Sequence, residues 1–125
     1  MCIRDRAQTL RRAYELNVPA LVTPGFLPGE QSESVASSFL STDCPHVVID
    51  TVKPAEDGQG LIVRIYEAYN QRGSGTLTFA TPLLSAVECN PLEETLGKAQ
   101  YKENTLSFQV KPFEIKSFRV QLAQI

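Results

Sequence analysis

The chain has 125 residues, of which 42% are hydrophobic and 21% charged, and its formal net charge is -2. This length suits one domain with a buried core and is too short for two ordinary domains. A nearly neutral, slightly acidic composition lacks the positive charge of a typical nucleic-acid-binding protein. No apolar run approaches the roughly 20 residues that a membrane-spanning helix needs. We therefore expect neither a nucleic acid nor a membrane as partner.

The first six residues, Met-Cys-Ile-Arg-Asp-Arg, differ in character from the rest of the chain. They contain no apolar segment and no small-residue cleavage site, so they do not match a targeting signal. They resemble instead the translation of a DNA adapter used in sequencing libraries. We therefore expect residues 1–6 to be an artefact and the chain to be a fragment of a longer reading frame.

Residues 7–36 are predicted to form a junction with an upstream part of the parent protein. Apolar side chains recur at three- and four-residue steps over 7–17, which predicts a short helix. Asn17 is suited to the C-cap of this helix, and Pro19 prevents its continuation. A helix of this length is only marginally stable unless it packs on something else.

A short strand over residues 20–23 is predicted to follow the helix. Residues 28–38 are rich in Gly, Glu, Gln and Ser, which is typical of an exposed loop. This loop marks the expected domain boundary. Residues 37–125 are then predicted to form one domain, which begins with an edge strand over residues 37–40.

The remainder of the chain has the pattern of short strands separated by Gly- and Pro-containing turns. The predicted strands cover residues 47–52, 61–69, 76–81, 85–89, 105–110 and 113–122. The first two are joined by an Asp-Gly turn and are expected to pair as a β-hairpin. Six or seven strands without a βαβ rhythm predict an all-β fold, an antiparallel β-sandwich with a short N-terminal helical segment.

Three details of this sandwich are also predicted. The glycine-rich stretch 70–75 is expected to be a turn, and the polar stretch 90–104 a connection anchored by Leu92 and Leu96. Apolar residues change parity within 113–122, which predicts a bulge near Lys116. Most Tyr and Phe side chains are expected to point inward.

Few residues have the spacing of a catalytic or metal site. Glu56-Asp57 and Glu93-Glu94 are expected to be solvated loop pairs, because adjacent loop carboxylates do not span a substrate cleft. His46 lies near Ser41 and Asp43, but the chain has no Gly-x-Ser-x-Gly turn for a nucleophile, so a surface or strand-capping role is expected.

The three cysteines, Cys2, Cys44 and Cys89, are too few and too widely spaced for a disulfide scaffold or a zinc knuckle. Cys44 and Cys89 are expected to be small buried free thiols, which is typical of a reducing compartment and predicts a cytoplasmic location. With a single histidine in the chain, we expect no zinc site formed by this chain alone.

The most distinctive polar group is Arg64 with Tyr66 and Glu67, in the middle of an apolar strand. A charge at such a position needs a partner, and Glu67, Glu88 or Glu114 is expected to provide it across the sheet. The alternative is that Arg64, Tyr66 and Glu67 contact another domain or edge a sugar-binding cleft.

Several segments together resemble one family. They include Lys-Pro-Ala-Glu-Asp-Gly at 53–58, Leu-Ile-Val-Arg-Ile-Tyr-Glu-Ala at 61–68, Leu-Glu-Glu at 92–94 and Pro-Phe-Glu-Ile-Lys at 112–116. In this order they resemble the C-terminal β-domain of α-mannosidases of glycoside hydrolase family 38. The segment Ala-Tyr-Glu-Leu-Asn-x-Pro at 13–19 is similar to the family's sequence just upstream.

This resemblance implies a parent enzyme that hydrolyses α-linked mannose with retention, using a zinc ion and an Asp nucleophile. No segment of the chain matches the motifs of the family's catalytic barrel, so no catalytic, cofactor-binding or metal-binding residue is assigned here. The implied partners are the missing catalytic and middle domains, with oligosaccharide bound through the parent. The alternative is a free-standing carbohydrate-binding or adhesive β-sandwich.

Overall fold

The computed structural model describes residues 9–22 and 37–123. The chain divides into two units, Met1–Ala36 and Ser37–Ile125. The expected adapter residues 1–6 and most of the expected loop over 28–38 lie outside the described residues.

The first unit contains the predicted helix as α2 (Thr9–Asn17). The side-chain amide of Asn17 donates to the Ala13 carbonyl at 2.7 Å, and the Val18 amide donates to the Tyr14 carbonyl at 2.8 Å. The second bond satisfies a carbonyl of the last helical turn that would otherwise be unpaired, and the first adds a side-chain donor at the same end. The predicted strand that follows is wrong for residues 20–22, which are not in a strand and expose Leu21 and Val22 almost fully.

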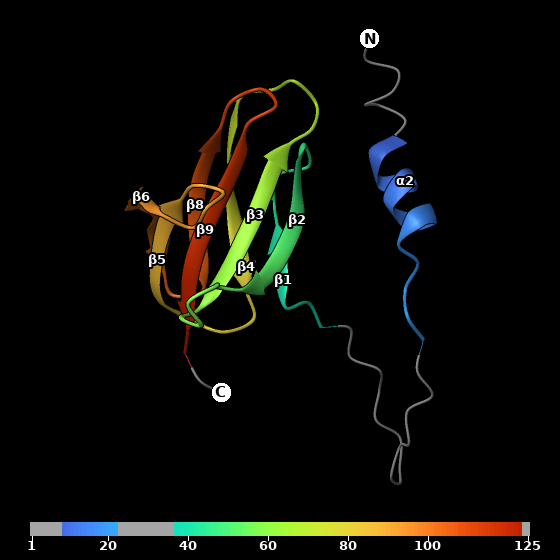
Figure 1. Ribbon diagram of the computed structural model, residues 1–125. Coiled ribbons are helices and arrows are strands. Elements are labelled where there is room, and N and C mark those ends of the chain that lie inside the picture. The colour runs from blue at the N-terminus through green and yellow to red at the C-terminus, as the bar shows by residue number, and fades with distance from the viewer. Residues whose placement is uncertain (1–8, 23–36, 124–125) are drawn as a thin grey trace, which may run out of the picture. The chain divides into compact units, whose positions relative to one another are not determined.

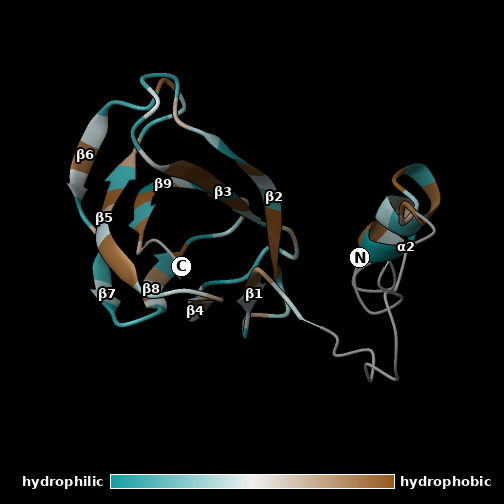
Figure 2. Cartoon of the chain, turned by 90° about the horizontal axis from the view of Figure 1, so that it is seen from below, coloured by the Kyte–Doolittle hydropathy of each residue, from teal (hydrophilic) through white to brown (hydrophobic). Residues whose placement is uncertain are grey.

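The second unit is a sandwich of two antiparallel sheets (Figure 1). The four-stranded sheet has the order β1 (Leu40–Thr42), β4 (Gly73–Phe79), β8 (Thr105–Val110), β7 (Gln100–Lys102). The five-stranded sheet has the order β2 (Val47–Pro54), β3 (Leu61–Glu67), β9 (Ile115–Leu122), β5 (Leu83–Cys89), β6 (Thr95–Lys98). Seen along the strands, the two sheets face each other as two layers (Figure 2). The predicted all-β sandwich is confirmed.

The core lies between the two sheets and follows the alternation of the strands. On β8, Leu106, Phe108 and Val110 are buried while Ser107 and Gln109 are exposed, as the period of two predicts. The largest fully buried side chains of the core cluster come from both sheets: Val63, Ile65, Phe118 and Val120 from one, Leu77, Phe79 and Leu106 from the other. Burial of this apolar surface is the main favourable term for the fold.

The predicted hairpin is confirmed as β2 paired with β3, in register from Val47 opposite Glu67 to Pro54 opposite Leu61. The turn between them needs glycine, because Gly58 and Gly60 both have positive φ, at 72° and 90°. The Ala55 amide donates to the Gly60 carbonyl at 3.0 Å and closes the turn.

Two predicted loops are partly strands. The expected turn over 70–75 contains the start of β4 at Gly73, and the expected connection over 90–104 contains both β6 and β7. Leu92 and Leu96 are 80% and 66% exposed, so they do not anchor this stretch. The edge strand predicted over residues 37–40 is β1, which begins at Leu40.

The predicted bulge near Lys116 is also wrong. β9 pairs with β3 in continuous register from Leu61 opposite Val120 to Tyr66 opposite Ile115. The change in parity arises because Phe113 and Ile115 are exposed apolar residues, whereas Phe118 and Val120 are buried in the core. Apolar residues of both parities therefore occur here without a bulge.

Candidate functional site

The outer face of the five-stranded sheet carries Arg64 and Tyr66, two of the three residues that the sequence singled out. Val48, Tyr66 and Ile115 are cross-strand neighbours on β2, β3 and β9, so they form a row across three strands. Ile115 is 62% exposed, and Phe113, just before β9, is 65% exposed. We call Val48, Tyr66, Phe113 and Ile115 the outer apolar face. Phe113 is an exception to the expectation that most Tyr and Phe side chains point inward, as are Phe39 and Tyr101, which are also exposed.

Glu67 lies at the end of this row but is 1% exposed and faces the interior. Its carboxylate accepts three backbone hydrogen bonds, from the amides of Tyr69 at 2.7 Å, Asn70 at 3.0 Å and Phe113 at 2.8 Å. A buried carboxylate is tolerated when its oxygens are satisfied in this way. Glu67 therefore joins the end of β3 to the turn before β9 and is not available to another domain.

Arg64 is not paired with Glu67, Glu88 or Glu114, as the sequence had suggested. Its Nε donates to Ser117 Oγ at 3.2 Å, and its terminal nitrogen donates to the Pro91 carbonyl at 3.4 Å. Glu88 pairs instead with Lys116, at 2.6 Å. Among the described residues no carboxylate forms an ion pair with Arg64, so its charge remains available on the outer face.

Glu93 corrects a second expectation, because it is buried and not a solvated loop residue. Its carboxylate contacts Lys53 Nζ at 2.7 Å and accepts the Glu56 amide at 2.9 Å, and Arg119 lies 3.7 Å away. The hydrogen bond from Lys53 and the bond from the Glu56 amide lower the pKa of Glu93. Glu94 is exposed, as predicted.

Glu56 and Asp57 lie in an exposed turn, as predicted, but both have partners. Glu56 accepts from Lys53 Nζ, and Asp57 contacts Arg119 at 2.6 Å. The hydrogen bonds from the Gln59 amide and Arg119 lower the pKa of Asp57. The turn is thus fastened to the sheet by charge pairs that converge on Arg119 and Glu93.

The cysteines and His46 do not form a catalytic group in the described residues. Cys44 and Cys89 are free and buried, and burial raises the pKa of both thiols. A thiol with a raised pKa is a poor nucleophile near neutral pH. His46 lies beside the Cys44 sulfur, whereas Asp43 is bound to the amide and hydroxyl of Thr76, so the Ser41, Asp43 and His46 arrangement is not a triad.

Within residues 9–22 and 37–123, no three His, Cys, Asp or Glu side chains are grouped so that they could hold a metal ion. In the same part of the chain, no helix is long and apolar enough to cross a membrane. The described residues therefore offer no fit for the zinc ion that the sequence resemblance implies.

The comparisons with known proteins agree with the resemblance found in the sequence. The profile of the glycosyl hydrolases family 38 C-terminal beta sandwich domain matches residues 46–118. The chain is 33% identical over 119 residues to Alpha-mannosidase G of Dictyostelium discoideum, covering 90% of this chain and 11% of that protein. It is 31% identical over 123 residues to Alpha-mannosidase 2C1 of Mus musculus, and the match covers 94% of this chain and 12% of that protein. It is also 31% identical over 121 residues to Alpha-mannosidase 2C1 of Homo sapiens, and the match covers 93% of this chain and 11% of that protein. The chain spans about a tenth of the length of these curated relatives.

Proposed function

Because the chain belongs to glycosyl hydrolases family 38, through that family's C-terminal β-sandwich domain, we propose that it is a non-catalytic accessory domain of a longer α-mannosidase. The observation that carries this proposal is the coverage of the matches. At least 90% of this chain aligns with each relative, but the aligned segment is only about a tenth of the relative's own length. The parent hydrolyses α-linked mannose, and its zinc ion and nucleophile belong to sequence outside this chain.

In this proposal, residues 37–125 form the accessory domain and residues 7–36 form the junction with the parent's middle and catalytic domains. The outer apolar face is the surface that docks on those domains, with Arg64 as its cation. Support comes from Phe113. Its side chain is exposed, and its backbone φ of 56° lies in the left-handed region, which bulky residues rarely adopt. A bulky residue there costs roughly 1–2 kcal/mol, and such strain concentrates where a side chain has a task.

The location we propose is the cytoplasm. The support is the pair of buried free thiols, Cys44 and Cys89, because thiols persist where the surroundings are reducing. Oligosaccharide reaches this domain only through the parent's cleft in this proposal.

The test is an activity assay of the purified 125-residue chain with an aryl α-mannoside, with and without added zinc. We expect no turnover above the uncatalysed rate in either condition, because no three described His, Cys, Asp or Glu side chains are grouped to hold a metal ion and burial raises the pKa of the Cys44 and Cys89 thiols. Zinc-dependent turnover by the pure chain would overturn the proposal that it is non-catalytic.

A further inference from the structure

Arg64 lies directly beside the outer apolar face and is held in a fixed position there. On β3 it is two residues from Tyr66, on the same side of the sheet, and its neighbour on β9 is Ser117. Its Nε donates to Ser117 Oγ at 3.2 Å, and one terminal nitrogen, Nη2, donates to the Pro91 carbonyl at 3.4 Å. The other terminal nitrogen, Nη1, has no hydrogen-bond partner among the described residues. A guanidinium keeps its charge in proteins, so Arg64 presents unused N–H donors from a fixed position.

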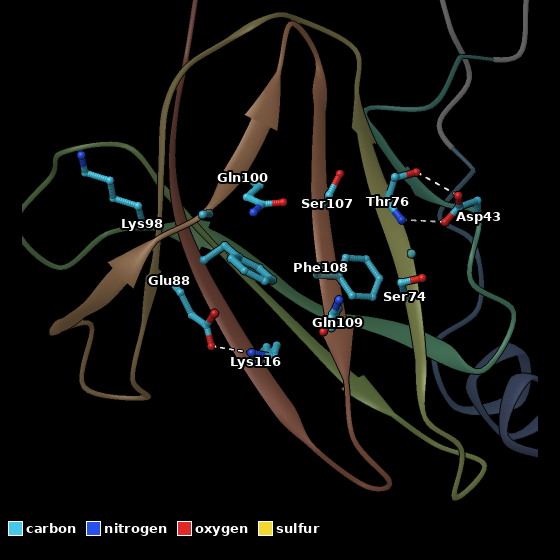
Figure 3. Close-up of a pocket in the computed structure, with 13 residues that line it drawn as sticks. Asp43, Ser74, Thr76, Glu88, Lys98, Gln100, Ser107, Phe108, Gln109 and Lys116 are labelled. Carbon is cyan, nitrogen blue, oxygen red and sulfur yellow. Dashed lines mark hydrogen bonds and ion pairs between the residues drawn. The ribbon is translucent and has the colours of Figure 1, made fainter.

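The carboxylates on the strands and turns of the same sheet already bind other groups of the chain. The ion pairs are Glu93 with Lys53 at 2.7 Å, Asp57 with Arg119 at 2.6 Å, and Glu88 with Lys116 at 2.6 Å, of which the last is drawn in Figure 3. Glu67 binds three backbone amides. Within the described part of the chain, Arg64 is therefore a partly covered cation without a carboxylate. A charge beside apolar side chains favours a partner of opposite sign.

The turn that carries the exposed Phe113 side chain is also held in place. Glu67 accepts the Phe113 amide at 2.8 Å, and within the turn the Glu114 amide donates to the Lys111 carbonyl at 3.1 Å. The Lys111 amide in turn donates to the Glu114 carboxylate at 2.7 Å. These three bonds fix the backbone on both sides of Phe113. A surface that is ordered before it binds loses little conformational entropy on docking.

We propose that the partner of the outer apolar face is an apolar segment of the parent's upstream chain that carries an Asp or Glu side chain, and that this carboxylate pairs with Arg64. The proposal rests on the accessory role proposed above and names the chemistry of the docking partner. Chain for this purpose exists, because the segment that matches is only 11% or 12% of each relative. A carboxylate complements the cation, and apolar side chains complement the face around it. A second copy of this chain does not complement it, because a two-fold contact brings the same cation from both sides.

The first experiment identifies the covering segment in a chimera, in which this chain replaces the matching 119-residue segment of the Dictyostelium relative. A photoreactive benzoylphenylalanine takes the place of Phe113, and the cross-linked peptide is identified by mass spectrometry. We expect a peptide from the relative's own sequence that contains Asp or Glu. The same photoreactive residue in place of Leu96, which is 66% exposed on β6, is the matched control and should not label that peptide. No cross-link, a cross-link between two copies, or a peptide without Asp or Glu would overturn the proposal.

The second experiment tests the ion pair with Arg64→Glu, measured both in the chimera and in the isolated 125-residue chain. The variant should lower the melting temperature of the chimera by at least about 3 °C more than that of the isolated chain, because only the chimera contains the partner. Arg72→Glu is the matched control, since Arg72 is an exposed cation just before β4 on the other sheet, and its shifts should be equal in the two proteins. Replacing the acidic residue of the cross-linked peptide by Lys should restore the melting temperature of the Arg64→Glu chimera.

The outcomes separate this proposal from the accessory role on which it rests. Equal shifts for Arg64→Glu in an active chimera and in the isolated chain would overturn the ion pair and leave the accessory role standing. A folded wild-type chimera without turnover would overturn the accessory role, and the proposed partner segment with it.

Discussion

Two carboxylates, Glu67 and Glu93, fasten loops to the sheet that carries the outer apolar face. Glu67 has the same parity as the inward-facing Ile65, so its burial could be predicted from the alternation of β3. Its third hydrogen-bond donor, the Phe113 amide, lies 46 residues downstream, so this contact could not be predicted from the local sequence. Glu93 is turned inward by a positive φ of 67° in a turn held by the Asn90 side chain, which local polarity does not reveal.

Glu67→Gln should destabilise the domain by roughly 2–3 kcal/mol, because charge-assisted bonds from three backbone amides to a buried side chain are weakened. Chemical denaturation of the wild type and the variant measures the difference. Glu94→Gln is a suitable control, because Glu94 is exposed, and should change stability much less. Equal stability of the Glu67 variant and the wild type would contradict the role assigned to Glu67.

Stability should decrease in acid, and Glu93 should contribute to the decrease. Its folded pKa lies below its ordinary value of 4.5, so its contribution is complete above pH 4.5 and is lost as the pH falls through the folded pKa. The pKa values of Asp43 and Asp57 also lie below their ordinary value of 3.8 in the folded chain, so both residues contribute stability that is lost in acid. Denaturation curves between about pH 6 and pH 3 should show a shallower loss for Glu93→Gln than for the wild type. Parallel pH profiles would contradict this assignment.

At the level of elements, the strands with clear alternation, β3 and β8, and the β2–β3 hairpin were predictable from sequence. The strands β6 and β7 were missed because every residue in them is exposed, so no buried face marks them. They form local hairpins, β6 with β5 and β7 with β8, in which Thr95 pairs with Cys89 and Lys102 with Thr105. The start of β4 was mistaken for a turn because Gly73 and Gly75 are typical turn residues.

Gly75 is needed in β4 for space and not for a turn. A Cβ there would lie 2.7 Å from the Cys44 Cβ and 2.8 Å from the Phe108 ring, so Gly75→Ala should cost roughly 1–3 kcal/mol. Gly97→Ala on β6 is the matched control, since a Cβ there meets nothing within 4 Å. Thermal unfolding of both variants tests this, and equal melting temperatures would contradict it.

On the scale of the whole molecule, the outer apolar face remains uncovered in the sandwich by itself. The folded chain should therefore bind a hydrophobic dye, because contiguous exposed apolar surface is unusual on a self-sufficient domain. Ile115→Lys should reduce dye fluorescence, whereas Leu96→Lys, at a similarly exposed position on β6, which β5 separates from β9, should not. A folded monomer that binds no dye would contradict the proposed docking surface.

The central claim, that this sandwich completes a longer α-mannosidase, is tested most directly in a chimera. The 119-residue segment of the Dictyostelium relative that matches this chain is replaced by the chain, and aryl α-mannoside turnover is compared with that of a deletion of the same segment. We predict that the deletion abolishes turnover, that the chimera restores it, and that Ile115→Lys lowers it while Leu96→Lys does not. A fully active deletion, or a folded chimera as inactive as the deletion, would contradict the claim.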